Sequence, residues 1–471
     1  MLFFKSKTDE FESAEAAEAV DHSDRYVVTS ILLEVLYAGI LFLKEPSLAL
    51  TYVYALIPML LITAVFGTYL YNRDADMKLF GAITKLSASG IALQILVDSV
   101  YHPPTTFSLV KYGISFVFLF FFLVFYNLLK KLLNHPFMVW LTLAASAAVY
   151  IVLAVYGVDP NGYGTTAWIR IAGYTVQLTD LTKICAVLFY AALFSSKHEY
   201  TDAGILKISS LFFFVNLLGS LWIKEIGSFF ILYFLHLSIL LIFMDHNKTK
   251  RIYILAILGA SVLAVGSAFV LYKWMLPAYN AGTLNSLQAM IWPYIKKIYT
   301  RFSITANINM DPYGAGYQLL QAKKALWMSG LFGNTVNFNA LPIAESDMAY
   351  VAFVSNFGFI LGFYLILQFL RILLSGSELS RSLLRFERQD SLVVYGITVV
   401  IFLQAMMVIL GSCNVIPFAG LPIPFLSRGN TYQSIVFAFS GLLLQLSMHK
   451  NPVVEEGGDV HDEPPGQQLA G

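Results

Sequence analysis

The sequence has few charged residues for its length. Only 13% of its 471 residues are Asp, Glu, Lys or Arg, whereas about 25% is usual for a soluble domain. The first 25 and the last 23 residues hold 16 of these 59 charged residues, so the long segment between them is poorer still. Hydrophobic residues make up 58% of the chain. A soluble fold cannot cover its surface with so few charges, and the composition predicts a membrane protein.

Several functional motifs are also missing. The two cysteines, Cys185 and Cys413, lie far apart and form no CxxC pair, so neither a disulfide framework nor a structural zinc site is predicted. The net charge of +1 excludes nucleic-acid binding by bulk charge. The chain contains no GxxxxGK[ST], HExxH or GxSxG pattern. Phosphate-loop enzymes, zinc proteases and serine hydrolases are therefore not indicated.

The two ends of the chain are polar. Residues 1–25 contain seven acidic residues and lack the apolar stretch of a signal peptide. Residues 449–471 are rich in Gly, Pro and acidic residues. Both segments are predicted to be disordered cytoplasmic tails, because neither can bury enough apolar surface to fold.

The segment between the tails predicts an all-α, polytopic membrane helix bundle. A helix needs about 20 mostly apolar residues to cross a bilayer. Residues 26–158 form an N-terminal transmembrane region in this prediction, and residues 159–448 form a second region that contains the long loop 273–347. The twelve expected spans are 26–43, 48–71, 79–100, 106–129, 137–158, 178–195, 208–223, 226–244, 252–272, 348–370, 392–412 and 431–448.

The distribution of Lys and Arg predicts the orientation. With a cytoplasmic N-terminus, the inside segments hold 17 Lys and Arg residues and the short outside loops hold 4. Cytoplasmic loops carry the excess of positive charge, so both termini are expected in the cytoplasm. Segments 159–177, 273–347 and 413–430 then face the outside. Their aromatic and apolar residues favour ordered loops, and we expect a site built from all three at the outer membrane face.

Asp347 is the first candidate for chemistry. It lies in the sequence LPIAESDMAYVAF, where a polar loop enters the tenth span. One interpretation is a structural cap, because a carboxylate at a helix start is favoured by the helix dipole. The other is a general base, which needs a lone pair near a hydroxyl and partial shelter from water.

Asp180 and Lys183 form a second candidate site. Their spacing of three residues places them on one face of the sixth span. Charges within spans are costly and usually face the bundle interior or a cavity. The pair is either a self-neutralising structural element or a phosphate site in which Lys183 contacts an oxygen and Asp180 positions it.

Three further charged residues stand out on the outside. Arg301 precedes the ordered-looking DPYGAGYQ stretch, and Arg428 lies in PIPFLSRGN. We expect both to bind anions, because a guanidinium contacts phosphate through two parallel hydrogen bonds. Glu225, in KEIGSFF at the start of the eighth span, is a further candidate.

Four blocks of the sequence resemble one known family. AWIRIAGYTVQLTDLTK is similar to RWLxIGxxxxQPSELxK, with Trp168, Gln177 and Lys183 matching and Asp180 in place of Glu. KEIGSFFIL resembles PDLGTALVL, with Glu225 in place of Asp. The long block from Arg301 through Gln318 to LPIAESD, and then AGLPIPFLSRGNTYQS, follow in the same order. These are the blocks of the SEDS proteins FtsW, RodA and SpoVE, and Asp347 falls on that family's catalytic aspartate.

The resemblance implies a fold and an activity. The fold is a SEDS core of ten spans with two extra spans before it. The activity is that of a peptidoglycan glycosyltransferase, which polymerises lipid II outside the bacterial cytoplasmic membrane for division, elongation or sporulation. Asp347 would take the proton of the acceptor hydroxyl, which attacks the donor sugar with inversion. Arg301, Lys183 and Arg428 would support the leaving pyrophosphate. Asp180, Glu225, Trp168 and Gln318 would bind substrate.

The resemblance also implies partners and permits a cofactor. The partner is a class B penicillin-binding protein, together with other divisome or elongasome membrane proteins and no nucleic acid. The metal is unidentified, and a divalent cation, magnesium or manganese, is compatible with the chemistry.

The sequence departs from the family pattern beside the expected site. Glu345 stands where the family has His, residues 354–358 read VSNFG instead of GEELG, and Arg428 replaces Tyr. These changes keep two alternatives open. One is a catalytically inactive scaffold for a penicillin-binding protein. The other is a transporter or flippase for a lipid-linked precursor, for which Lys85, Asp98 and Lys111 are the early-span charges.

Overall fold

The computed structural model describes residues 24–100, 109–160, 162, 164–171, 174–195, 200–245, 247–334, 341–428 and 430–448. The tails expected to be disordered lie almost wholly outside these residues. The chain is predominantly helical, as predicted. Nine helices in the described part are long and apolar enough to cross a membrane, and α10 is a shorter apolar helix.

Every one of the twelve expected spans coincides with helical structure. The second span is divided among α3 (Ala49–Leu61), the π-helical turn η2 (Ile62–Phe66) and α4 (Gly67–Tyr71). The other eleven are α2 (Asp24–Lys44), α5 (Met77–Val100), α6 (Leu109–Leu133), α7 (Phe137–Tyr156), α8 (Thr179–Ser195), α9 (Asp202–Trp222), α10 (Gly227–Phe243), α11 (Lys248–Asn280), α14 (Ala349–Leu383), α15 (Arg388–Ser412) and α16 (Asn430–Ser447).

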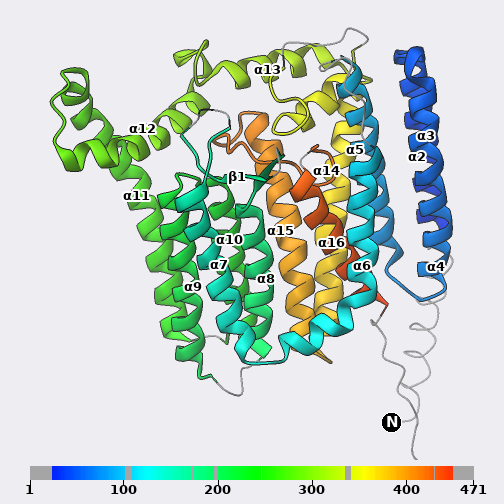
Figure 1. Ribbon diagram of the computed structural model, residues 1–471, viewed down its shortest axis with the longest axis horizontal. Helices are drawn as coiled ribbons and strands as arrows, with labels where there is room; N and C mark the ends of the chain where they lie inside the picture. Colours follow the sequence, from blue (N-terminus) through cyan, green and yellow to red (C-terminus); the bar gives the residue numbers. More distant parts are fainter. Residues whose placement is uncertain are drawn as a thin grey trace, which may run out of the picture.

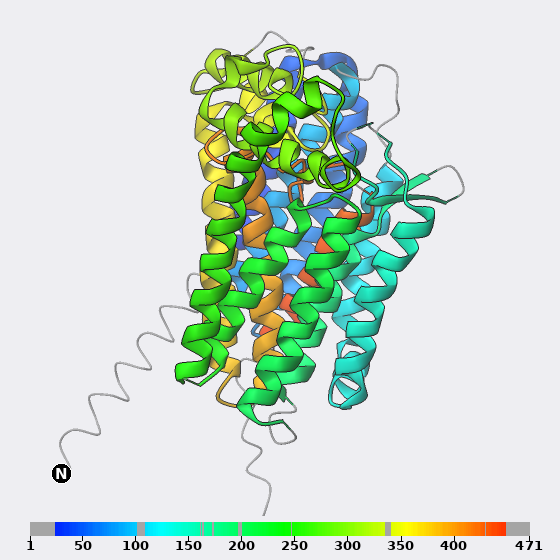
Figure 2. The ribbon, with the colours of Figure 1, turned by 90° about the vertical axis from the view of Figure 1, so that its left-hand side faces the viewer.

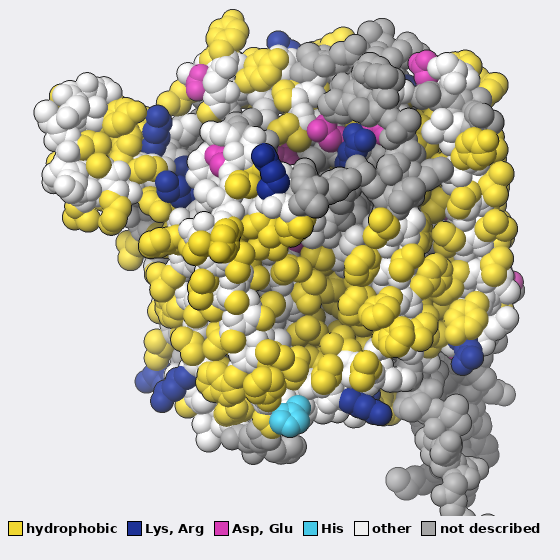
Figure 3. Space-filling model, viewed as in Figure 1, with side chains coloured by type: hydrophobic (Ala, Val, Ile, Leu, Met, Phe, Trp, Pro, Cys, Tyr) yellow, Lys and Arg dark blue, Asp and Glu magenta, His cyan; other side chains and the backbone are white. Residues whose placement is uncertain are grey.

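The helices stand side by side in one bundle (Figures 1 and 2), and successive helices run in opposite directions. Twelve alternating passes place the start of α2 and the end of α16 at the same end of the bundle. Figure 3 shows a broad hydrophobic band across the visible face of the bundle, with Lys and Arg side chains above and below it. This pattern is what a bilayer requires of a spanning bundle.

Further elements cover the end of the bundle opposite the start of α2 (Figure 1). They are α12 (Ser286–Ala306), α13 (Tyr317–Ser329) and a hairpin of β1 (Trp168–Ile171) and β2 (Tyr174–Gln177). The hairpin is antiparallel, with Trp168 paired to Gln177. The described parts of the loop 273–347, residues 273–334 and 341–347, are thus ordered, as expected, but the helices in them were not predicted. Asn285 and Gln288 form a reciprocal capping box that fixes the start of α12.

α5 lies at the centre of the bundle, because the whole of its membrane-spanning window is buried. It packs against α2 and α14. Gly90 lets α5 approach the 413–430 segment closely, since a Cβ atom there would lie 1.9 Å from the carbonyl oxygen of Phe425. Gln94, one turn further on, donates to the carbonyls of Leu426 and Glu345. α5 therefore holds two of the loops that cover the bundle.

α14 is interrupted within its expected span. Gly358 has φ 90° and ψ 169°, a conformation that only glycine adopts readily. The segment after α13 fills the break: the amide of Asn334 donates to Ser355 O, and the amide of Phe359 donates to Gly330 O. Such irregular backbone is tolerated in a membrane protein where protein groups satisfy it. The break leaves a short half-helix, residues 349–357, at the covered end.

Replacing Gly90 by Ala is expected to destabilise the protein by about 1–3 kcal/mol, because a methyl group would overlap the backbone of the 413–430 segment. The measurement is the thermal unfolding midpoint in detergent. Gly39→Ala on α2 is the matched control, since a Cβ there meets nothing within 4 Å. Equal midpoints for the two variants would contradict the close packing of α5.

Candidate functional site

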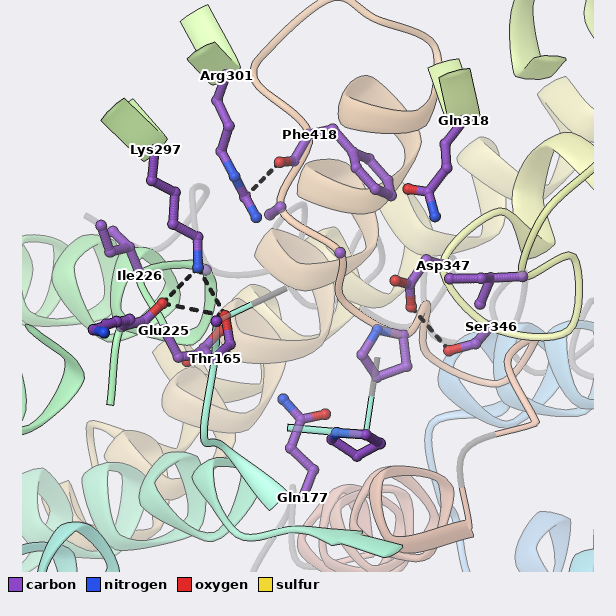
Figure 4. A pocket seen from close by; sticks show the side chains of 18 of the residues that line it. Thr165, Gln177, Glu225, Ile226, Lys297, Arg301, Gln318, Ser346, Asp347 and Phe418 are labelled. Atoms are coloured by element: carbon purple, nitrogen blue, oxygen red, sulfur yellow. Dashed lines mark hydrogen bonds between the residues drawn. The ribbon is translucent and has the colours of Figure 1, made fainter. Parts of the chain in front are cut away.

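A cavity of about 800 Å³ opens at the covered end of the bundle. All three segments expected to form the site contribute to it, together with the turn between α9 and α10. Of the eight residues predicted for the site, seven line this cavity: Trp168, Asp180, Glu225, Arg301, Gln318, Asp347 and Arg428. Figure 4 shows Asp347 on one side and Glu225 with Lys297 on the other, with Arg301 reaching in from α12. The structure therefore brings together residues up to 260 positions apart in the chain, Trp168 and Arg428.

Asp347 lies in a tight turn that directly precedes α14. The amides of Ser346 and Met348 both donate to the carbonyl of Ile343, which closes the turn. The N-cap position of α14 belongs to Met348, and the hydroxyl of Ser346 donates to the Asp347 carboxylate at 3.0 Å. Asp347 is therefore placed as a cavity residue and not as a helix cap. This arrangement favours the general-base interpretation over the structural one.

The surroundings raise the pKa of Asp347 from 3.8 to about 6, chiefly through burial away from water. The hydrogen bond from Ser346 and the charge of Arg301 act in the opposite direction, and Glu345 adds to the rise. Gly420, at φ +64°, leaves room beside the carboxylate: a Cβ there would lie 3.3 Å from Asp347 Oδ2. A carboxyl group with a pKa near neutrality is suited to exchange protons with a substrate.

Two cations on α12 face the cavity one helical turn apart. Arg301 Nη1 donates to the carbonyl of Phe418 at 2.5 Å. Lys297 Nζ donates to Thr165 Oγ1 at 2.7 Å and to the carbonyl of Lys224 at 2.6 Å. Burial first, and then the charge of Arg301, lower the pKa of Lys297 to about 8. The two cations present concentrated positive charge to an anion in the cavity.

Glu225 lies beside Lys297 in the turn before α10. Its Oε1 accepts from the amide of Ser228 at 2.9 Å, so the side chain partly caps α10. Its Oε2 is buried without a hydrogen-bond partner in the described structure. Burial raises the pKa of Glu225, while the nearby charges of Lys183 and Lys297 oppose this rise. One oxygen is therefore structural, and the other has an unmet hydrogen-bonding capacity.

The predicted pair of Asp180 and Lys183 is present, but its members differ in position. Lys183 is fully buried and does not line the cavity. Its Nζ donates to Asp180 Oδ1 at 2.6 Å and to Gln404 Oε1 at 2.8 Å, and it lies 4.8 Å from the centre of the Tyr432 ring. Asp180 lines the cavity, and its Oδ2 has no hydrogen-bond partner among the described residues. Lys183 is thus placed to act on the cavity through Asp180.

Arg428 lines the cavity but is already paired. Its Nη1 lies 2.6 Å from Asp98 Oδ1 near the end of α5, and its amide donates to the carbonyl of Glu345. The side chain therefore joins the 413–430 segment to α5 and to the turn that holds Asp347. Its positive charge toward the cavity is partly neutralised by Asp98.

Sequence reasoning missed several residues of this cavity. The most important is Lys297, since it supplies a second cation beside Arg301. Lys297 lies four residues before Arg301. This spacing places two side chains on one face of a helix, but no helix was expected there. The other unpredicted polar lining residues include Thr165, Gln177, Lys224, Lys296 and Tyr432.

No group of three or more His, Cys, Asp or Glu side chains in the described parts of the chain could hold a metal ion. Asp180 and Glu225 both line the cavity, and one carboxylate oxygen of each is buried without a hydrogen-bond partner among the described residues. Two carboxylates fit the way Mg²⁺ is usually held, with the remaining ligands supplied by water and substrate phosphates.

These observations define a class: a multi-span helical membrane protein with a charged cavity at the end of its bundle. The chain belongs to the FtsW, RodA and SpoVE family of cell cycle proteins, whose model matches residues 68–452. The family resemblance read from the sequence is thereby confirmed. The match begins at α4, so α2 and α3 precede the family region.

Individual proteins show the same relationship. The chain is 26% identical over 409 residues to a probable peptidoglycan glycosyltransferase FtsW of Enterococcus hirae, covering 82% of this chain and 96% of that one. It is 24% identical over 315 residues to the stage V sporulation protein E of Bacillus subtilis, covering 64% and 76%.

Solved structures share the fold. A peptidoglycan synthase complex described as coordinating polymerization and crosslinking contains a chain that matches with a TM-score of 0.61 at 16% identity, covering 80% of this chain and 98% of that one. The rod shape determining protein RodA of Thermus thermophilus matches with a TM-score of 0.50 at 15% identity, covering 80% and 96%.

Replacing Asp347 by Asn is expected to stabilise the protein above about pH 6 and to leave it unchanged below about pH 4. The folded protein raises the pKa of this carboxyl group from 3.8 to about 6, so the folding free energy lost to its ionisation grows between these two values and is complete above about pH 6. The gain is about 1–2 kcal/mol at pH 8, below the full value of the shift because the cavity is open to water.

The measurement is the thermal unfolding midpoint between pH 4 and 8. Glu378→Gln removes an exposed carboxylate at the far end of α14 and serves as the control. A gain that does not depend on pH would show that the Asp347 carboxylate is not penalised in the folded state.

Proposed function

We propose that this protein is a peptidoglycan glycosyltransferase that polymerises lipid II into glycan strands. The single observation that carries the proposal is the cavity in which Asp347, with a pKa near 6, faces the cations of α12. Glycosyl transfer from a lipid diphosphate needs both features: a base for the acceptor hydroxyl and positive charge for the departing diphosphate. The names of the relatives agree with this activity.

Asp347 acts as the general base. It accepts the proton of the acceptor sugar hydroxyl as that oxygen attacks the anomeric carbon of the donor. The bond from this carbon to the diphosphate breaks in the same step, so the configuration inverts. Ser346 orients the carboxylate through its hydrogen bond. Below about pH 6 Asp347 becomes protonated, and the rate is expected to fall.

Arg301 and Lys297 stabilise the diphosphate leaving group. Lys297 has three ammonium hydrogens and two described acceptors, Thr165 and the Lys224 carbonyl, so one hydrogen is available to a phosphate oxygen. Lys183 assists Arg301 and Lys297 indirectly, by holding Asp180 in place through a hydrogen bond. A divalent cation, when bound, would be held by Asp180 and Glu225 and would offset negative charge on the diphosphate. Trp168 and Gln318 are available to contact the sugar or peptide portions.

The proposed location is the bacterial cytoplasmic membrane, with the cavity at the outer face and both termini in the cytoplasm. The excess of Lys and Arg in the segments at the opposite end supports this orientation. The lipid chain of the substrate would then remain in the bilayer while its sugars enter the cavity.

The proposed partner is a class B penicillin-binding protein, which cross-links the glycan. Trp327, Leu331 and Phe332 are 88%, 61% and 79% exposed beside the break in α14. An apolar patch of this kind outside the predicted spans favours contact with another protein. The solved relative that forms a synthase complex agrees with such a partner.

A transport function receives less support. A flippase needs a charged path through the bundle, and its expected early-span residues were Lys85, Asp98 and Lys111. Lys85 Nζ donates to Thr29 Oγ1, and Asp98 pairs with Arg428. The side chain of Lys111 lies outside the described structure. The two described charges therefore hold neighbouring elements together.

Replacing Asp347 by Asn is expected to abolish polymerisation, with a loss of at least about 10³-fold, because the amide cannot accept the hydroxyl proton. The measurement is glycan-chain formation from labelled lipid II by the purified protein with its penicillin-binding partner. Glu378→Gln, at the far end of α14, is the matched carboxylate-to-amide control. Equal product from wild type and Asp347→Asn would refute the base assignment. No product from either, with the complex intact, would favour the scaffold.

Replacing Lys297 by Met is expected to lower kcat/KM by about 10–100-fold, the value of a charge-assisted hydrogen bond. Because the pKa of Lys297 is about 8, its charge is present below that pH and is lost above it. The difference between wild type and variant is therefore expected to shrink above about pH 9. Lys323→Met, an exposed lysine on α13, is the control. A constant difference across pH would show that the charge of Lys297 does not act on the substrate.

A further inference from the structure

α2 and α3 lie before the family-matched region, which starts at residue 68. They stand at one edge of the bundle (Figure 1), where α2 packs against α5. One contact extends from α2 directly to the part of α14 that follows Asp347, and a second reaches that part through Asn334. Both converge on the stretch from Phe353 to the break at Gly358.

The first contact is made by Tyr37 of α2, whose side chain touches both α5 and α14. Its side chain is 2% exposed, and its hydroxyl hydrogen-bonds with Ser89 on α5 at 2.8 Å. The ring meets Phe357 edge-on at 5.4 Å between centroids and Phe353 at 6.1 Å. Edge-to-face pairs of this kind add stability beyond the area they bury.

The second contact is Lys44, two helical turns further along α2. Its Nζ donates to the carbonyl of Asn334 at 2.8 Å. The amide of the same residue donates to Ser355 O inside the break of α14. Lys44 therefore holds the segment that fills the break, while Tyr37 holds the half-helix from its side.

The half-helix needs this support. Residues 349–357 form only nine residues of helix, and isolated helices shorter than about 12–15 residues are marginal even when their sequences favour helix. All nine side chains are buried, so packing fixes the position of the half-helix. Asp347 lies two residues before its start. A shift of the half-helix moves the carboxylate, and a misplacement of about 1 Å can cost 10²-fold in rate.

We propose that α2 is a built-in positioning element for Asp347, and that Tyr37 and Lys44 are its positioning residues. They hold the half-helix and the 330–334 segment in one arrangement, which keeps the carboxylate aimed into the cavity. The catalytic consequence rests on the proposed glycosyltransferase function. The proposed effect on the position of the half-helix does not depend on that function, and it is measured separately.

The first experiment is amide hydrogen exchange on the full-length protein in detergent or nanodiscs. Tyr37→Ala is expected to speed exchange in residues 349–357 and 330–334 by at least about tenfold, and to leave α7 and α9 unchanged. Tyr37→Phe keeps the ring contacts and is expected to restore most of the protection. Lys44→Met is expected to act mainly on residues 330–334.

Tyr52→Ala is the matched control, because Tyr52 on α3 is a buried tyrosine with no described ring contact to α14. It is expected to loosen α3 without changing residues 349–357. Unchanged exchange in Tyr37→Ala would overturn the proposal. So would equal loss of protection in Tyr37→Ala and Tyr52→Ala, since α2 and α3 would then act only through general stability.

The second experiment measures chain formation from lipid II over a pH series. Tyr37→Ala is expected to lower kcat by about 10–100-fold with little change in KM, to shift the acidic limb of the pH profile, and to be rescued in Tyr37→Phe. Loss through KM alone would overturn the positioning role. If the wild-type protein forms no chains while the exchange pattern holds, the proposed function fails and the mechanical role of α2 stands.

Discussion

The rest of the structure depends on keeping a carboxylate and several cations together in a partly dry cavity. Asp347 is held where ionisation is costly, and Arg301 and Lys297 face the same space. Charged groups arranged in this way stabilise the charges of a transition state only if the groups themselves stay fixed during the reaction. The buried α5, the capped α12 and the filled break in α14 each fix one wall. Placing these charged groups in the cavity lowers the folding stability of the protein.

The walls are fixed by backbone contacts as much as by side chains. Gly90 brings α5 against the 413–430 segment, and Gly358 opens α14 so that another segment can bond into it. These two features couple the loops to the spans. The loops that carry Asp347 and Arg428 are therefore extensions of the bundle. Membrane helices from both the N-terminal and the C-terminal parts of the chain position the site.

The sequence predicted the spans well because a bilayer imposes length and hydropathy on each one. It also predicted most of the cavity through motifs such as that around Asp347. It could not predict α12, whose charged and aromatic residues resemble an ordered loop, and so Lys297 was missed. It also could not predict the hydrogen bond of Lys183 to Gln404 or the ion pair of Arg428 with Asp98, because those contacts join distant segments. The extra spans were predicted, but their contacts with α14 depend on tertiary packing.

The most direct test of the account is a structure of the Asp347→Asn protein with lipid II bound. The account predicts the diphosphate within hydrogen-bonding distance of Arg301 and Lys297, and a sugar hydroxyl or anomeric carbon beside residue 347. The lipid chain would leave the cavity toward the hydrophobic band. A headgroup bound deep between the spans, or at the opposite end of the bundle, would contradict the proposed site and favour transport instead.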